Sequence, residues 1–359
     1  MIAKAGSDTA PALITGGAGF IGTNLAHRLL SIGRPVRVLD NLAREGVQRN
    51  LAWLRARHGE RLDVELADVR DAAAVERAVA DAGQVYHFAA QVAVTTSLHE
   101  PVEDFDVNAR GTMHVLEALR RRPDPPPLLF TSTNKVYGRL EELALRGYAT
   151  RYRPLDPAVQ RHGIAEQQLA FHSPYGCSKG AADQYVLDYA RSFGLPTVVF
   201  RMSCIYGPHQ CGCEDQGWLA HFLRTAITDA RLSVYGDGRQ VRDVLFVDDL
   251  IDAMTLAMRN INRTAGRAFN IGGGPGNTLS LLELIAMIGR LHGQAPSVTF
   301  DAWRPGDQRY YVSDIRRFQE LTGWRPRVTV REGIARLYAF LASTAAGPLR
   351  IDESERTVA

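Results

Sequence analysis

Short apolar segments alternate with longer amphipathic segments through roughly the first 200 residues of the chain. The short segments have the length of buried strands, and the longer ones repeat their apolar residues at helical spacing. The predicted strands are 12–15, 35–40, 62–67, 84–89, 128–132 and 197–202, and the predicted helices are 21–32, 72–82, 102–121 and 175–193. This alternation predicts an α/β fold, in which a doubly wound parallel sheet of the Rossmann type carries helices on both faces.

The alternation stops near residue 206. From there, turn-rich pieces separate predicted helices at 248–259, 281–291 and 331–341. We therefore predict that residues 1–205 mainly form the Rossmann domain and that residues 206–345 mainly form a smaller C-terminal lobe that caps the sheet. Residues 346–359 are small and charged, and are expected to form a flexible tail.

The composition narrows the class of protein. Of the 359 residues, 45% are hydrophobic and 8% aromatic, as in an ordinary globular protein. The 42 basic and 39 acidic side chains nearly balance, so a nucleic-acid partner is not expected. No apolar run approaches the roughly 18 residues of a membrane span, and residues 1–11 lack the apolar core of a secretory signal. We expect a cytoplasmic protein with reduced cysteines and no membrane partner.

A glycine-rich turn directly follows the first predicted strand. Gly16, Gly19 and Gly22 recur at every third position and open the next predicted helix. The first glycine permits a tight turn, the second lets backbone N–H groups approach a pyrophosphate, and the third lets the helix pack closely on the strand. A glycine triplet alone is a weak signal, but strand, turn and helix in this order are the context that a dinucleotide site requires.

Asp40 ends the second predicted strand, eighteen positions after Gly22. An acid at this place accepts hydrogen bonds from both adenosine ribose hydroxyls and repels a 2′-phosphate, so we expect NAD rather than NADP. Asp68 and Val69, which end the third strand, are expected beside the adenine. The predicted cofactor-binding residues are Gly16, Gly19, Phe20, Ile21, Gly22, Asp40, Asn41, Asp68, Val69, Ala89, Tyr175 and Lys179.

Tyr175 and Lys179 lie four positions apart on a predicted helix, so their side chains project from one face. A nearby ammonium group stabilises a phenolate, and we expect Lys179 to lower the pKa of Tyr175 from about 10 toward neutrality. Thr131, Ser132 and Thr133 end the fifth strand at the carboxyl edge of the sheet, where ligands bind in such folds. We predict that Tyr175 is the catalytic acid/base, that Lys179 assists it and that Thr133 hydrogen-bonds the reacting hydroxyl.

The TGGxGxxG turn, the strand-end Thr133 and the YxxxK pair together resemble the extended short-chain dehydrogenase/reductase family, the NAD-dependent epimerases and dehydratases of nucleotide sugars, over about residues 12–341. Segments 132–138, 172–185 and 215–218, and an insertion at 141–171, resemble more narrowly the 2-epimerases of that family, of the CDP-paratose and CDP-tyvelose type.

The resemblance implies an isomerase of carbohydrate biosynthesis that works as a homodimer. In the implied reaction, Tyr175 takes the proton of the C2 hydroxyl of a nucleotide-linked hexose while hydride leaves C2 for the nicotinamide. Hydride then returns to the other face of C2, so NAD is regenerated. Lys179 would also hold the nicotinamide ribose, and Asn108 matches the family's structural asparagine near the active site.

The resemblance further implies that the C-terminal lobe binds the nucleotide diphosphate of the substrate. Arg242 and Arg309 lie in matching contexts, and guanidinium groups suit bidentate contact with phosphate. Tyr235 matches a strand on the base side. The predicted substrate-binding residues are Asn134, Gln216, Tyr235, Arg242 and Arg309.

One loop departs from the family's pattern, which has arginine at position 209. His209, Cys211 and Cys213 stand there at alternating positions and could in principle bind zinc. Structural zinc sites, however, usually space their cysteines by two or more residues, and a fourth ligand is not evident. We predict reduced thiols that line a loop, and no metal site.

Three alternative functions stay open: a 4-epimerase of the family, a 4,6-dehydratase of the family, and a non-catalytic regulator that binds NAD. Family dehydratases carry Thr-Asp-Glu where this chain has Thr133, Asn134 and Lys135, so the carboxylates that elimination needs are replaced. The intact Tyr175 and Lys179 argue against a regulator.

Overall fold

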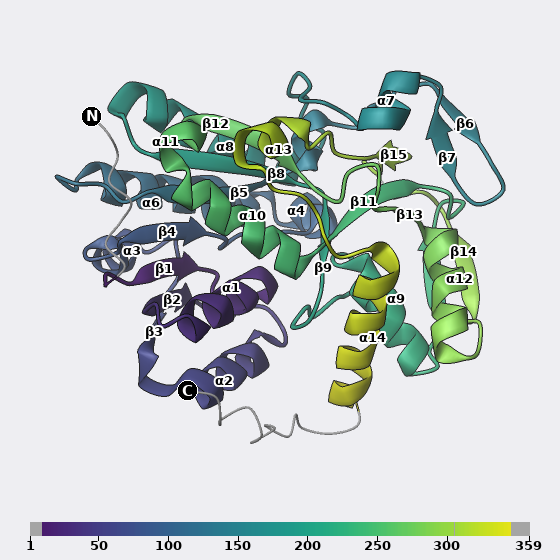
Figure 1. The fold of residues 1–359 in the computed structure, drawn as a ribbon, viewed down its shortest axis with the longest axis horizontal. Helices are drawn as coiled ribbons and strands as arrows, with labels where there is room; N and C mark the ends of the chain where they lie inside the picture. Colours follow the sequence, from purple (N-terminus) through teal and green to yellow (C-terminus); the bar gives the residue numbers. More distant parts are fainter. Residues whose placement is uncertain (1–8, 305, 346–359) are drawn as a thin grey trace.

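A seven-stranded parallel sheet forms the centre of the protein. The computed structural model describes residues 9–304 and 306–345 (Figure 1), so the predicted tail at 346–359 lies outside the described residues. The strand order in the sheet is β12-β8-β5-β4-β1-β2-β3. These strands are β1 (Ala12–Thr15), β2 (Val36–Asp40), β3 (Leu62–Leu66), β4 (Gln84–His87), β5 (Leu128–Thr133), β8 (Thr197–Met202) and β12 (Arg267–Ile271).

Helices cover both faces of this sheet, because its strands carry apolar side chains in both directions. On β1, Ile14 packs into one core and Leu13 into the other. The first core is closed by α1 (Phe20–Ser31), α2 (Val47–His58) and α10 (Val247–Arg259), and the second by α3 (Ala72–Val79), α6 (Gly111–Arg120) and α8 (Pro174–Phe193). The predicted fold class is confirmed.

This domain differs from the prediction in several features, among them α2, which is not among the predicted helices. Strand β12 comes from the region assigned to the C-terminal lobe and pairs with β8, so the sheet has a seventh strand and the Rossmann domain is not contiguous in sequence. The single helix predicted at 102–121 is instead α5 (Pro101–Phe105), a π-helical segment (Asp106–Arg110) and α6. A local pattern cannot predict the seventh strand or the divided helix, because both depend on partners distant in sequence.

The second lobe is built on two small sheets. One contains β9 (Cys204–Tyr206), β11 (Val241–Phe246), β13 (Thr278–Ser280) and β15 (Tyr310–Tyr311), and the other pairs β10 (Leu232–Tyr235) with β14 (Val298–Asp301). Its longer helices are α9 (Trp218–Ile227), α12 (Leu281–His292) and α14 (Val330–Ala345). The shorter helices of the chain are α4 (Val94–His99), α7 (Pro157–His162), α11 (Ile261–Thr264), α13 (Arg316–Thr322), and the 3₁₀ turns η1 (Gly59–Arg61) and η3 (Asn134–Tyr137).

The insertion before Tyr175 packs on this second lobe. It forms the hairpin β6 (Leu145–Gly147) and β7 (Tyr152–Pro154), followed by α7. Arg151 forms an ion pair with Glu283 at the start of α12, with a shortest N–O distance of 2.5 Å, and the Tyr152 hydroxyl donates to Asp237 at 2.6 Å. The hairpin therefore lies at the same end of the molecule as α12 and β14 (Figure 1).

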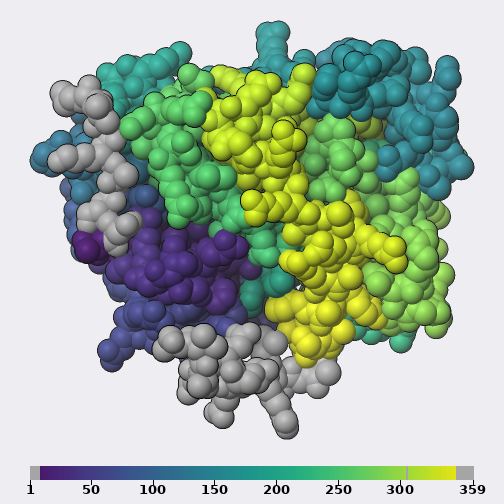
Figure 2. Space-filling model, viewed as in Figure 1, coloured from purple at the N-terminus to yellow at the C-terminus, as the bar shows by residue number. Residues whose placement is uncertain are grey.

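The space-filling view shows that the N-terminal segment, in purple, and the C-terminal segment, in yellow, lie on the same face of the molecule (Figure 2). Within residues 9–304 and 306–345, none of the helices has both the length and the apolar composition needed to cross a bilayer.

Candidate active site

The glycine turn brings the start of α1 close to the end of β1. Gly16 has a φ of +68°, and a Cβ there would lie 2.7 Å from the backbone nitrogen of Ala89. A Cβ on Gly22 would lie 2.5 Å from the carbonyl oxygen of Gly16. A side chain at either position would separate the turn from the helix or from β4, so these glycines allow the close approach that a pyrophosphate site requires.

Asp40 is held in a fixed orientation at the end of β2. One carboxylate oxygen accepts the backbone N–H of Ala18 at 3.0 Å, and the other accepts that of Leu42 at 2.8 Å. Burial raises the pKa of Asp40, and these two hydrogen bonds oppose the rise. Because a carboxylate has about four acceptor positions, the group still has acceptor capacity for a ligand.

Asp68 lies beside Asn41 at the same end of the site. The Asn41 amide donates to its carboxylate at 2.7 Å, and Arg70 donates to it at 2.8 Å. The hydrogen bonds from Arg70 are the main reason that the pKa of Asp68 falls to about 2. The Asp68 side chain is therefore an ionised acceptor whose position is set by its neighbours.

A cavity of about 550 Å³ runs along the carboxyl edge of the sheet. It also contains a buried hydroxyl, that of Ser132, for which the described part of the chain provides no hydrogen-bond partner. A cavity lined by the glycine turn, by the carboxylate at the end of β2 and by the Ser132 hydroxyl fits a dinucleotide. All twelve predicted cofactor residues line it: Gly16, Gly19, Phe20, Ile21, Gly22, Asp40, Asn41, Asp68, Val69, Ala89, Tyr175 and Lys179.

Helix α8 carries the predicted acid/base into this cavity. Ser173 caps the helix by accepting the N–H of Gly176 at 3.0 Å, and Pro174 occupies its first turn. The backbone N–H of Tyr175 donates to the Ser97 hydroxyl at 3.1 Å. Tyr175 therefore sits in a rigid first turn, with Thr133 of β5 lining the same cavity.

The pKa values of Tyr175 and Lys179, the predicted catalytic pair, differ from the prediction. Burial raises the pKa of Tyr175 to about 12, and a hydrogen bond with Thr133 opposes the rise. Burial also lowers the pKa of Lys179 to about 7, opposed by the charges of Asp183 and Asp104. The predicted lowering of the Tyr175 pKa by Lys179 is therefore wrong for this structure, because desolvation outweighs the other effects on both groups.

The Lys179 side chain is buried against an aromatic ring. Its nitrogen lies 4.2 Å from the centroid of the Phe130 ring, on the aromatic face that attracts cations. Only 3% of Lys179 is exposed. The lysine thus lines the cofactor cavity as a deeply buried group.

Asn108 organises the backbone beside α8, the helix that carries the predicted acid/base. It lies in the π-helical segment between α5 and α6, and its amide donates to the Gln91 carbonyl and to the Ser178 hydroxyl, each at 3.0 Å. Ser178 in turn donates to Asp104. The π-helical turn places the Asn108 side chain in the interior, where it links α8 to the loop after β4.

A second cavity, of about 330 Å³, meets the first at Thr133, Asn134 and Tyr175 and extends into the C-terminal lobe. Four of the five predicted substrate-binding residues line it: Asn134, Gln216, Tyr235 and Arg242. Asn134 donates to Gln308 at 3.0 Å, and Gln216 accepts from Arg44 at 3.1 Å. The two cavities thus share a junction at the predicted catalytic residues.

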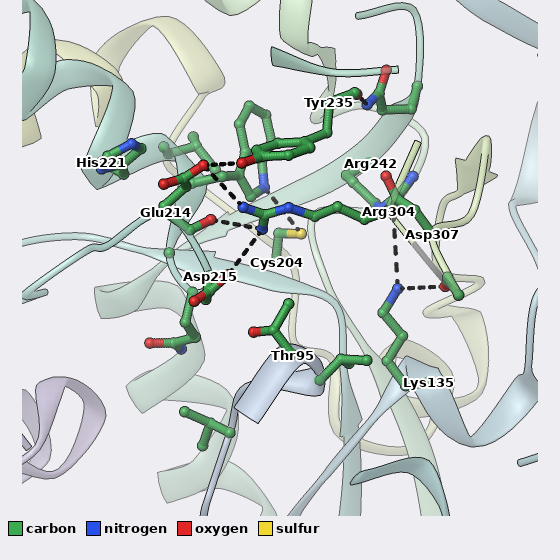
Figure 3. Close-up of a pocket in the computed structure, with 18 of the residues that line it drawn as sticks. Thr95, Lys135, Cys204, Glu214, Asp215, His221, Tyr235, Arg242, Arg304 and Asp307 are labelled. Carbon is green, nitrogen blue, oxygen red and sulfur yellow. Dashed lines mark hydrogen bonds and ion pairs between the residues drawn. The ribbon is translucent and has the colours of Figure 1, made fainter. Parts of the chain in front are cut away.

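Arg309 does not line this cavity, so the structure does not bring it together with the other predicted substrate-binding residues, and its role stays a prediction. It is exposed, and its guanidinium group lies 5.5 Å from the centroid of the Trp303 ring. Arg304 instead enters the cavity, stacks 3.9 Å above the ring of Tyr235 and donates to the Glu214 carbonyl at 2.8 Å (Figure 3). Both arginines belong to one sequence segment, and only the tertiary fold distinguishes them.

Lys135, Glu214, Asp215 and His221 also line the second cavity, and they were not among the predicted site residues (Figure 3). Lys135 and Asp215 lie inside the segments that carry the family resemblance, and that signal could have identified them.

The cysteine-containing loop packs against other elements. His209 is 8% exposed, and its ring lies 4.2 Å from Trp53 and 5.0 Å from Phe340, measured between centroids. Cys211 is half-buried and Cys213 is exposed. In the described part of the chain, His, Cys, Asp and Glu side chains form no group of three or more that could hold a metal ion.

The comparison with protein families gives one match, to the NAD dependent epimerase/dehydratase family, over residues 12–272. The chain belongs to this family. The predictions of the family, of an enzyme and of NAD as its cofactor are confirmed.

Similar proteins of this family include epimerases and dehydratases. The chain is 42% identical to CDP-paratose 2-epimerase of Salmonella typhi, with 92% of this chain and 99% of that protein covered. It is 34% identical to dTDP-glucose 4,6-dehydratase of Streptomyces griseus, with 91% and 93% covered. The solved UDP-glucose 4-epimerase of Thermus thermophilus in complex with NAD is 31% identical, with 92% and 98% covered and a TM-score of 0.76.

Proposed function

We propose that this protein is a nucleotide-sugar 2-epimerase, an isomerase that inverts C2 of a CDP-linked hexose of the CDP-paratose or CDP-tyvelose type. The observation that carries the proposal is the junction of the two cavities. Thr133, Asn134 and Tyr175 lie there, with Lys135 lining the second cavity, in a chain 42% identical to a CDP-paratose 2-epimerase.

The twelve residues that line the first cavity would hold the cofactor, with Asp40 toward the adenosine ribose and Lys179 toward the nicotinamide ribose. When bound, NAD supplies a reversible hydride acceptor for the sugar carbon. Tyr175 accepts the proton of the C2 hydroxyl as that carbon becomes a ketone, and gives it back when the ketone is reduced from the other face. Thr133 hydrogen-bonds the same oxygen and keeps it beside the phenol.

Tyr175 can accept the proton of the C2 hydroxyl only when its own phenol is ionised. With the pKa near 12, the buried phenol is protonated at neutral pH. Proton acceptance needs the phenolate, and a positive charge placed beside the ring lowers the pKa of the phenol. We therefore expect Tyr175 to become a base only in the loaded site.

Asn134 and Lys135 favour epimerisation over dehydration. Elimination of water after oxidation needs an additional acid and base, which the family's dehydratases provide as carboxylates after the strand-end threonine. An amide and an ammonium group occupy those positions here, and neither is a carboxylate. We therefore propose that the oxidised sugar is reduced again without loss of water.

The test is incubation of the protein with CDP-, GDP- and UDP-linked hexoses without added cofactor, followed by NMR of the sugar products. Inversion at C2 of a CDP-hexose supports the proposal. Inversion at C4 would indicate a 4-epimerase, and loss of water a 4,6-dehydratase. Failure to convert any sugar, with NAD retained, would favour a non-catalytic regulator.

A homodimer is also part of the proposal. Leu98, Val102, Phe105 and Tyr185 are large side chains between 47% and 71% exposed, and they lie on α4, α5 and α8. Apolar side chains exposed on helices that pack side by side suit an interface with a second copy. A cytoplasmic location and a role in carbohydrate biosynthesis stay predictions that rest on the proposed substrate.

A further inference from the structure

Lys135 is one of only three lysines in the sequence. Lysine occurs only at positions 4, 135 and 179, and arginine provides the rest of the 42 basic residues. Lys135 and Lys179 both line the cavities of the candidate active site. Two of the three lysines of this arginine-rich chain therefore line the candidate active site. The proposed contact with the cofactor explains Lys179 but not Lys135.

The fold places Lys135 directly after the catalytic strand. Thr133 caps the turn η3, and its hydroxyl accepts the backbone N–H of Lys135 at 3.2 Å. The Lys135 side chain then extends into the second cavity, toward Asp307 and Arg242 (Figure 3). The ammonium donates to the Gly306 carbonyl at 3.4 Å and lies 4.0 Å from the Asp307 carboxylate.

Arg242 shares that carboxylate. Its guanidinium donates to the same Asp307 oxygen at 2.6 Å. One negative charge thus faces two positive charges, which leaves a net positive charge at this place. Burial lowers the pKa of Lys135, and Asp307 opposes the shift while Arg242 reinforces it. A ligand with a negative charge would relieve the repulsion between the two cations.

The covalent structure of a nucleotide sugar determines how far its phosphate lies from each carbon of the sugar ring. In a nucleotide sugar, C2 is bonded to the anomeric carbon, which carries the phosphate, whereas C4 lies across the ring. When C2 faces Tyr175 and Thr133, the phosphate linked to the sugar must therefore lie closer to these residues than when C4 does. A cation two residues after Thr133 matches the first arrangement.

We infer that Lys135 binds, together with Arg242, the phosphate linked to the sugar and thereby sets C2, rather than C4, against Thr133 and Tyr175. This inference rests on the proposed function. Lys135 is then a specificity-determining residue: it contacts the phosphate and acts on the reaction through the position of the sugar.

The test compares the binding of CDP and CMP to the NAD-loaded protein by calorimetry. CDP carries the second phosphate and CMP lacks it. In Lys135→Met we expect CDP binding to weaken by roughly tenfold to a hundredfold, the range for loss of a charge-assisted hydrogen bond, and CMP binding to change less than about threefold. Lys135→Arg should retain most of the CDP affinity. The matched control is Arg77→Met, which removes an exposed cation on α3.

Kinetics on the CDP-hexose that wild-type protein converts provide the second measurement. Lys135→Met should raise KM more than it lowers kcat, and should lower the fraction of product inverted at C2. An unchanged ratio of CDP to CMP affinity, or a loss of kcat with unchanged CDP binding, would overturn the inference. If Lys135→Met does not fold, which NAD content and thermal unfolding report, Lys135→Gln takes its place.

The result separates this inference from the proposed function. If wild-type protein inverts no sugar at C2 but Lys135→Met loses CDP selectively, the phosphate site stands and the proposed 2-epimerase reaction falls. If wild-type protein inverts C2 and the variant binds CDP normally, the reaction stands and the role of Lys135 falls.

Discussion

Asp40 at the end of β2 accepts the backbone N–H of Ala18 at 3.0 Å, so the acid that we predict to select the cofactor also anchors the glycine turn. The strand end and the turn are thereby held in one geometry. The same carboxylate accepts the backbone N–H of Leu42 at 2.8 Å, and the two hydrogen bonds together fix its orientation.

We expect the purified protein to carry NAD and Asp40→Asn to bind it roughly tenfold to a hundredfold more weakly, because an amide has one acceptor oxygen for the bonds that the carboxylate makes. Titration of stripped protein with NAD and NADP measures this. Asp63→Asn, on the exposed side of β3, is the control. Recovery of mainly NADP from the wild type would contradict the role of Asp40.

Tyr175→Phe should lower turnover by a factor on the order of 10²–10⁴, since it removes the proton acceptor and keeps the ring. Binding of NAD and CDP should stay within about twofold. Steady-state rates and calorimetry provide both measurements, with the exposed Tyr148→Phe as control. Near-normal turnover in Tyr175→Phe would mean that another group is the base.

A substrate deuterated at C2 should give product that is still deuterated there in ordinary water. The reason is that hydride transfer keeps the hydrogen within the site, whereas deprotonation of C2 exchanges it with solvent. Mass spectrometry and NMR of the product report the label. Complete washout would exclude hydride transfer at C2.

Arg304→Ala should weaken CDP binding by about tenfold or more, while Arg309→Ala should change it by less than about twofold. The first guanidinium enters the cavity above Tyr235, whereas the second is exposed beside Trp303. Calorimetry with CDP compares the two variants. The reverse order would support the predicted role of Arg309 in the substrate site.

Acid should destabilise the protein through the loop after β9. Burial lowers the pKa of His209 from 6.5 to about 4. Between pH 6.5 and pH 4 the unfolded chain therefore binds a proton at His209 that the folded protein does not bind. The contribution of neutral His209 to the free energy of unfolding is complete above pH 6.5 and is lost as the pH falls toward 4. For this one group we expect a loss of about 2 kcal/mol between pH 7 and pH 5.

Denaturant unfolding at both pH values checks this expectation. His209→Phe keeps a ring against Trp53 and Phe340 and should reduce the difference between the two pH values, whatever its effect at pH 7. His162→Gln, at the end of α7, should behave like the wild type. An unchanged pH dependence in His209→Phe would exclude His209 as the cause.

The sequence by itself determined the parts of the site that depend on neighbours along the chain. The turn from Gly16 to Gly22 needs only its own glycines and the flanking strand and helix, and Asp40 is the last residue of a strand recognisable from its apolar run. Tyr175 and Lys179 share a helix face because of helical spacing alone. All twelve predicted cofactor residues line one cavity, because the parallel sheet brings the carboxyl ends of its strands to one edge and α8 packs beside that edge.

Only the tertiary structure decided which distant segments meet. Strand β12 joins β8, the insertion hairpin packs on α12, and Arg304 rather than Arg309 enters the cavity. The pKa values of Tyr175 and Lys179 also depend on burial by residues distant in sequence. Desolvation and long-range pairing are properties of the packed interior, and a local pattern of apolar and polar residues does not contain them.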